Sequence, residues 1–231
     1  MKKSNRVLVI GLDGVTWTVL DPWIRDGSLP HLARLRQNGS WGKLRSTLPP
    51  LTAAAWSTFM TGKRPGKHGV FHFIDLFGQD ASNRGKPKIV NARNIQSSTL
   101  WDIAAHHQRQ VTMINVPMTY PPRKVNGTMI TCFLTPRNAP TFTYPPELST
   151  ELTDYIIDLD RFIDTKPYQG DHEKGVITPS LALLQEFRDM TEKRAKTSLS
   201  QMESQPWDFF YGGVYQHGSD GPLSLALSPF P

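Results

Sequence analysis

Asp13 is the first residue whose type and position suggest chemistry. It follows the continuous apolar run 7–10 and stands in the sequence Gly11-Leu12-Asp13-Gly14, which is typical of a turn after a strand. A carboxylate at the carboxyl end of a parallel strand faces the ligand crevice of an open sheet and can bind a divalent metal ion. The alternative is an aspartate that only accepts hydrogen bonds from turn amides. Position alone leaves both roles open.

Thr52 is the second such residue, because it follows Pro49-Pro50-Leu51 and opens a predicted helix at 52–61. The free amides and the positive end of a helix dipole stabilise an anion such as a phosphate or an alkoxide. A hydroxyl is a weak nucleophile until a base or metal activates it, and two metal ions about 4 Å apart can do so. The alternative is a simple helix N-cap, which Thr52 taken alone favours.

Strands and helices alternate along the chain, and these elements must position both residues. Continuous runs of β-branched residues and leucine are typical of strands buried on both faces, and we predict strands at 7–10, 42–47, 111–116, 129–134 and from 208. Spacing of apolar residues along one face predicts helices at 28–38, 52–61, from 98 and at 179–203. Loops are expected at 78–91 and 136–146. The alternation predicts an α/β fold with a mostly parallel sheet and helices on both faces.

Composition narrows the class of protein. The 231 residues, 38% hydrophobic and 20% charged, fit one globular domain and exclude general disorder. The net charge is +6, but the basic residues are scattered and form no recognition motif, so no nucleic-acid partner is expected. The single cysteine, Cys132, excludes an intramolecular disulfide and is expected to be buried. No apolar run is long enough for a membrane span, so we expect a soluble, cytoplasmic protein.

Histidines give no further site. His68 and His72 could bind a metal as a pair, or His68 could make a structural hydrogen bond in its turn. The family resemblance described below favours the hydrogen bond. His106 and His107 stand near a predicted helix end and are expected on the surface. We therefore name only Asp13 and Thr52 as site residues.

Residues 46–70 combine several short motifs. Thr52 follows a proline-containing loop, its predicted helix ends in Thr-Gly, and a Pro-x-x-His-Gly turn follows at 65–69. Together with the strand-terminal Asp13, this segment resembles the nucleophile region of the type I phosphodiesterase and nucleotide pyrophosphatase family, within the alkaline phosphatase superfamily. Similar segments occur at 28–32 and 115–122, and the resemblance covers about residues 7–210.

The resemblance implies a three-layer, alkaline-phosphatase-like α/β domain. In that family Asp13 would be a metal ligand, and Thr52 would be the nucleophile and also touch metal. The implied cofactors are two divalent ions, Zn²⁺ or alternatively Mn²⁺, and the implied substrate is a small-molecule phosphate ester, either a phosphodiester or a pyrophosphate. One departure concerns residues 53–55, which are all alanine, whereas nucleotide pyrophosphatases carry an asparagine soon after the nucleophile. This departure weakens the case for a nucleotide substrate.

The segment after Phe210 is predicted to differ from the rest. Residues 1–210 would be the amino-terminal part of the domain and 211–231 an atypical tail, since 211–218 is a poor continuation of a buried strand. Codons for 211–222, read one base later, can encode a hydrophobic strand with aspartate at 218 and histidine at 222. That spacing resembles the next ligand pair of the family. We expect a frame change that removes the C-terminal part of the fold; the alternatives are a natural short form or a different terminal fold.

Loss of the later ligands would impair the site. Asp13 and Thr52 alone are too few protein ligands to keep two metal ions bound, and the sheet would keep an unpaired edge that promotes aggregation. We expect weak or no activity, and the sequence leaves open whether this chain is an enzyme. The competing hypothesis is a non-catalytic remnant or binding module of the same fold.

Overall fold

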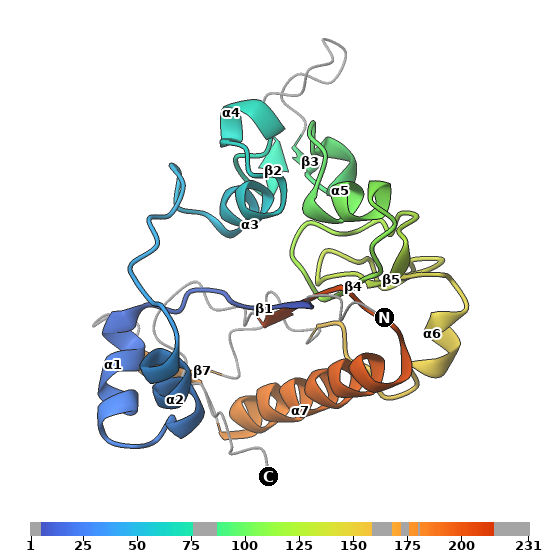
Figure 1. The fold of residues 1–231 in the computed structure, drawn as a ribbon. Helices are drawn as coiled ribbons and strands as arrows, with labels where there is room; N and C mark the ends of the chain where they lie inside the picture. Colours follow the sequence, from blue (N-terminus) through green and yellow to red (C-terminus); the bar gives the residue numbers. More distant parts are fainter. Residues whose placement is uncertain (1–5, 76–86, 159–167, 172–175, 180, 215–231) are drawn as a thin grey trace.

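A five-stranded sheet forms the centre of the fold (Figure 1). The computed structural model describes residues 6–75, 87–158, 168–171, 176–179 and 181–214. The strands, in spatial order, are β1 (Val7–Leu12), β9 (Phe209–Val214), β4 (Val111–Ile114), β5 (Gly127–Ile130) and β6 (Thr143–Tyr144). The first four are mutually parallel and β6 is antiparallel to β5, which confirms the predicted mostly parallel sheet.

Helices cover both faces of this sheet (Figure 1). One face carries α3 (Thr52–Thr61), α4 (Pro65–His68) and α5 (Leu100–His106). The long helix α7 (Leu181–Ser204) runs along the opposite face, with α1 (Trp17–Arg25), α2 (Pro30–Asn38) and α6 (Leu148–Glu151) at its sides. Two hairpins complete the described elements, together with the 3₁₀ helix η2 (Ala92–Asn94): β2 (Ile74–Asp75) with β3 (Lys88–Ile89), and β7 (Tyr168–Asp171) with β8 (Val176–Pro179). In the described part of the chain, no helix is long and apolar enough to cross a bilayer.

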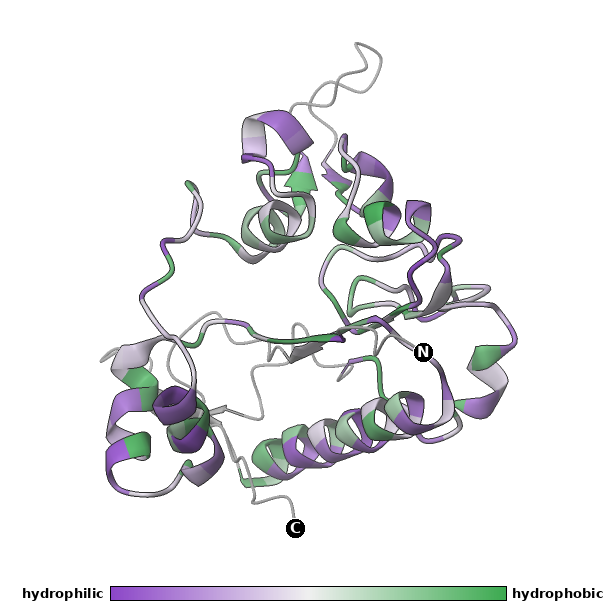
Figure 2. Ribbon diagram, in the orientation of Figure 1, coloured by the Kyte–Doolittle hydropathy of each residue, from purple (hydrophilic) through white to green (hydrophobic). Residues whose placement is uncertain are grey.

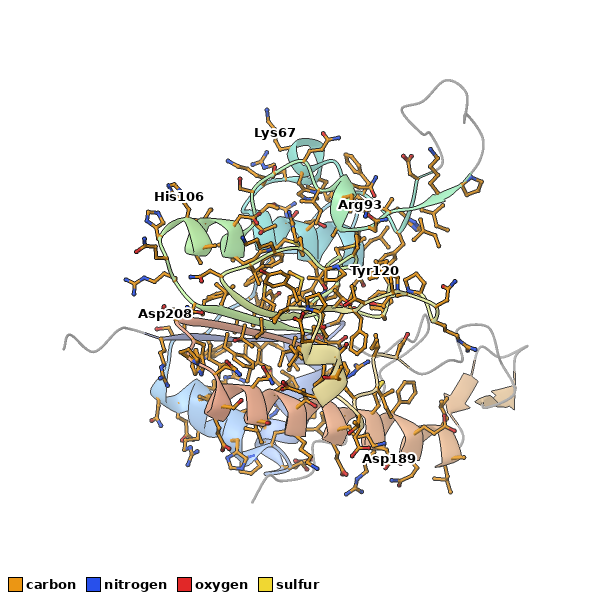
Figure 3. All side chains as sticks on the ribbon, turned by 90° about the vertical axis from the view of Figure 1, so that its right-hand side faces the viewer. Lys67, Arg93, His106, Tyr120, Asp189 and Asp208 are labelled. Carbon is orange, nitrogen blue, oxygen red and sulfur yellow. The ribbon has the colours of Figure 1, made fainter. Side chains whose placement is uncertain are left out.

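Two apolar layers separate the sheet from its helices. Successive residues of a strand face opposite sides, so Met113 packs with Trp101 toward α3 and α5 while Ile114 packs with Phe210 toward α6 and α7. Hydrophobic residues occur on α3, α5 and α7 (Figure 2), and side chains fill the space on both sides of the sheet (Figure 3). The three-layer arrangement predicted from the sequence is therefore present.

The amino-terminal quarter differs most from the prediction. The strand predicted at 42–47 is wrong: this segment has no regular structure and Leu44 is 91% exposed, because no neighbouring strand pairs with it. Helix α1 was not predicted, and α2 starts at Pro30 after Leu29, so Ser28 does not cap it. β1 was expected to be buried on both faces, but it is the outer strand and its side chains are exposed or half-buried.

Other boundaries shift by a few residues. The helix predicted from 98 begins at Leu100, because Thr99 caps it in a reciprocal pair with Asp102. The strand predicted at 129–134 lies at Gly127–Ile130, and the predicted loops at 78–91 and 136–146 contain the short strands β3 and β6. Residues 76–86 of the first loop lie outside the described residues. Cys132 is buried, as predicted.

The interpretation of 211–218 as a break in the strand is wrong as far as Val214. β9 continues to Val214 and pairs with both β1 and β4. The glycine at position 213 makes this possible: a β-carbon there would lie 2.5 Å from the backbone oxygen of Asn115, so only glycine fits that approach. Residues 215–231, including most of the predicted tail, lie outside the described residues.

Candidate functional site

Asp13 and Thr52 lie side by side at the carboxyl edge of the sheet. Asp13 comes directly after β1, and Thr52 is the first residue of α3. The Thr52 hydroxyl donates a hydrogen bond to Asp13 Oδ2 over 3.0 Å. Two residues separated by 39 positions in the sequence therefore form one polar pair, as the sequence predicted.

The alternative role of Thr52 as a helix cap is wrong. The N-cap residue of α3 is Leu51, and no side chain caps the helix. The first backbone hydrogen bond runs from the Ala55 amide to the Leu51 carbonyl, so the amides of residues 52–54 precede it. These amides and the positive end of the helix dipole favour negative charge beside Thr52.

Trp56 completes the site and was missed by the sequence analysis. Its indole N–H donates to Asp13 Oδ1 over 3.2 Å. Residues four apart lie on one face of a helix, so Thr52 and Trp56 reach the same carboxylate from adjacent turns. The Asp13 carboxylate thus accepts hydrogen bonds from two side chains of α3. The alternative interpretation of Asp13 involved only hydrogen bonds from turn amides. The one sequence feature that could have predicted this role of Trp56 is its spacing of four residues from Thr52.

His68 is a structural residue, as predicted. It is fully buried; its Nδ1 accepts from the Val70 amide over 3.2 Å, and its Nε2 lies 3.0 Å from the Thr58 hydroxyl. Since Nδ1 accepts, the neutral ring carries its proton on Nε2 and donates it to Thr58. His106 and His107 are exposed, and His106 points away from the body of the fold (Figure 3).

Burial of His68 makes stability depend on pH. Desolvation lowers the pKa of His68 below its ordinary value of 6.5, so the unfolded chain binds the proton more tightly than the folded one. The free energy of unfolding should therefore be highest above pH 6.5 and fall as the pH drops below it. We expect His68→Gln to be less stable at pH 7.5 but to lose less on acidification from pH 7.5 to 5.5. Urea unfolding at both pH values measures this; equal losses in both proteins would contradict it.

The donor chemistry around Asp13 suits a hard divalent metal ion, but the number of donors does not. A carboxylate and a hydroxyl are the two oxygen donors that the pair offers. Among the residues that the structure describes, no group of three or more histidine, cysteine, aspartate or glutamate side chains could hold a metal. Zn²⁺ sites take about four ligands and Mg²⁺-like sites about six. The described residues alone therefore do not offer enough side-chain donors for a complete metal site.

The three-layer fold with its mostly parallel sheet defines an alkaline-phosphatase-like α/β protein, as a comparison with solved structures shows. The crystal structure of phosphonoacetate hydrolase from Sinorhizobium meliloti 1021, in complex with phosphonoacetate, is similar with a TM-score of 0.58 and 15% sequence identity. The match covers 92% of this chain and 46% of that one, so this chain spans less than half the length of that hydrolase.

The sequence supports the assignment to a family directly. The profile of the type I phosphodiesterase / nucleotide pyrophosphatase family matches residues 7–221, which is most of the chain. This chain belongs to that family. A search of curated proteins found no match.

Proposed function

We propose that the Asp13–Thr52 pair hydrolyses phosphate esters of small molecules, with Thr52 as the nucleophile. The observation that carries this proposal is the 3.0 Å hydrogen bond from the Thr52 hydroxyl to Asp13 at the amino-terminal end of α3. Membership in a phosphodiesterase and pyrophosphatase family supports the reaction class. A phosphodiester or a pyrophosphate is the proposed substrate class.

The chemistry follows from the positions of the two side chains. Thr52 Oγ1 gives its proton to Asp13 Oδ2 and attacks phosphorus. The bond from phosphorus to the leaving oxygen breaks, and the leaving group departs with the displaced electron pair and takes up a proton. The hydroxyl proton lies on the side of Asp13 Oδ2, which fixes the direction of the oxygen lone pairs. The first amides of α3 stabilise the negative charge on the phosphoryl oxygens. Water then cleaves the phosphothreonine and regenerates the hydroxyl.

Metal dependence is part of the proposal. Asp13 and Thr52 would supply two ligands, and two divalent ions, Zn²⁺ or Mn²⁺, would stabilise the charges on the attacking and leaving oxygens. Because the described residues offer so few ligands, we propose that binding is weak and that hydrolysis by this chain is impaired.

Removal of metal tests this part. We expect bis(4-nitrophenyl) phosphate to be hydrolysed slowly, the rate to fall to background after dialysis against EDTA, and Zn²⁺ or Mn²⁺ to restore it. Asp13→Ala should raise the metal concentration needed for half-maximal rate by about 10-fold or more, the scale of losing supporting metal contacts. Release of 4-nitrophenol measures the rate, with the exposed Asp154→Ala as matched control. Unchanged turnover after chelation would exclude metal dependence.

The second candidate is a non-catalytic remnant or binding module of the same fold. It is favoured by the absence of a metal-ligand group of three among the described residues. Metal content of the purified protein separates the two: near-stoichiometric zinc or manganese supports the hydrolase, whereas metal-free protein that binds a phosphate ester without cleaving it supports the module.

A further inference from the structure

The Asp13 carboxylate is held at both of its oxygens by one helix. Thr52 donates to Oδ2 over 3.0 Å, and Trp56, one turn later in α3, donates to Oδ1 over 3.2 Å. A carboxylate on a single side chain rotates freely about its last bond unless a second contact fixes it. The indole N–H is such a contact, because it is a donor only and has one direction.

The Trp56 ring is itself held in place. It is 7% exposed and lies nearly parallel to the ring of Tyr211 in β9, with centroids 5.8 Å apart and an angle of 18° between planes. A β-carbon at Gly11 would lie 2.4 Å from the edge of the same indole, so the absence of a side chain at Gly11 leaves the space that the ring occupies. Gly11 lies two residues before Asp13, on the strand that carries the carboxylate. The ring therefore packs on the face of the sheet where β1 and β9 pair, beside Gly11 and Tyr211.

We infer that Trp56 is a positioning residue, whose indole N–H turns the Asp13 carboxylate so that Oδ2 faces Thr52. The catalytic consequence of this inference rests on the proposed function. The contact between Trp56 and Asp13 does not depend on that function. Trp56 has no route to the reacting atoms except through Asp13, because its one donor is engaged with Oδ1. Stacking on Tyr211 and the space left at Gly11 hold the indole so that its N–H points at Asp13 Oδ1.

Two measurements test the inference. Trp56→Phe keeps an aromatic ring against Tyr211 and removes only the donor and part of the indole; we expect kcat for bis(4-nitrophenyl) phosphate to fall about 10- to 100-fold with KM changed less than about twofold. Trp41→Phe, at a ring that is 54% exposed, is the matched control and should change neither. An unchanged kcat in folded Trp56→Phe, or a loss that appears only in KM, would overturn the inference.

The second measurement keeps Trp56 and does not need activity. In ¹⁵N–¹H spectra, the indole signal that disappears in Trp56→Phe should move in Asp13→Ala further than any other indole signal. The Trp17 indole, which donates to the Gly42 carbonyl over 2.9 Å, is an internal reference and should stay in place. A Trp56 signal that does not move would refute the contact. A signal that moves in a protein without hydrolysis would support the positioning of Asp13 and refute the proposed function instead.

Discussion

Thr52→Ala is expected to reduce hydrolysis of bis(4-nitrophenyl) phosphate to the uncatalysed rate. Alanine removes the only oxygen that the proposed mechanism places in line with phosphorus, and the remaining Asp13 carboxylate would repel the substrate anion. In a fully active hydrolase, loss of a nucleophile costs about 10⁶-fold in kcat. We propose that hydrolysis by this chain is impaired, so the largest loss that can be measured is the ratio of its own rate to the uncatalysed rate. Release of 4-nitrophenol from protein stripped of contaminating phosphatases measures it.

Two variants control this result. Thr52→Ser keeps a hydroxyl at the start of α3 and should retain part of the rate, since only a methyl group is lost. Thr150→Ala removes an exposed threonine of α6, far from Asp13 in the sequence, and should keep the full rate. Equal hydrolysis by wild type and Thr52→Ala would show that Thr52 is not the nucleophile and that any turnover arises elsewhere.

Trp101→Ala is expected to cause the largest loss of stability. Trp101 in α5 is 1% exposed and packs against the buried face of β4, so its removal leaves a cavity that the surrounding residues fill only in part. Large aromatic-to-alanine changes in cores cost about 3–5 kcal/mol. Urea unfolding followed by circular dichroism gives the change in free energy of unfolding.

The indole nitrogen of Trp101 offers a sharper comparison. It is buried and finds no hydrogen-bond acceptor among the described residues. Trp101→Phe keeps most of the ring and removes that unpaired donor, so it should cost about 1 kcal/mol or less. Trp41→Ala, at an exposed ring, should likewise have a small effect. A loss in Trp101→Phe as large as that in Trp101→Ala would mean that the nitrogen has a partner, such as a buried water.

The polar pair was predictable because each residue follows a local rule. Asp13 stands at the end of an apolar run before a glycine, and Thr52 stands after prolines before a helix; parallel strands and the following helices bring such positions to one edge of a sheet. Trp56 was not predictable, because an aromatic residue one turn into a helix normally packs in the core, and only the position of β1 shows that its nitrogen reaches the carboxylate.

The outline of the sheet was likewise predictable, and its edges were not. β4 is buried on both faces, as its continuous apolar run predicts, whereas β1 has a similar run but is exposed because no described strand lies beyond it. Residues 42–47 have strand-like composition without a partner. The prediction of a frame change after Phe210 stays a prediction, which gene sequencing tests. A larger residue in place of Gly213 in the other reading frame would require the ends of β4 and β9 to lie further apart than they do with glycine.

The place of β9 in the sheet has a consequence for how the protein is made. β9 lies between β1 and β4, so the strand that carries Asp13 joins the rest of the sheet only through residues about 200 positions later in the chain. Pairings between such distant segments form slowly. During synthesis on the ribosome, β1 and the Asp13 turn must wait, with apolar side chains in water, until residues 209–214 leave the exit tunnel. Nascent-chain association with chaperones should therefore persist until β9 has emerged and paired with β1.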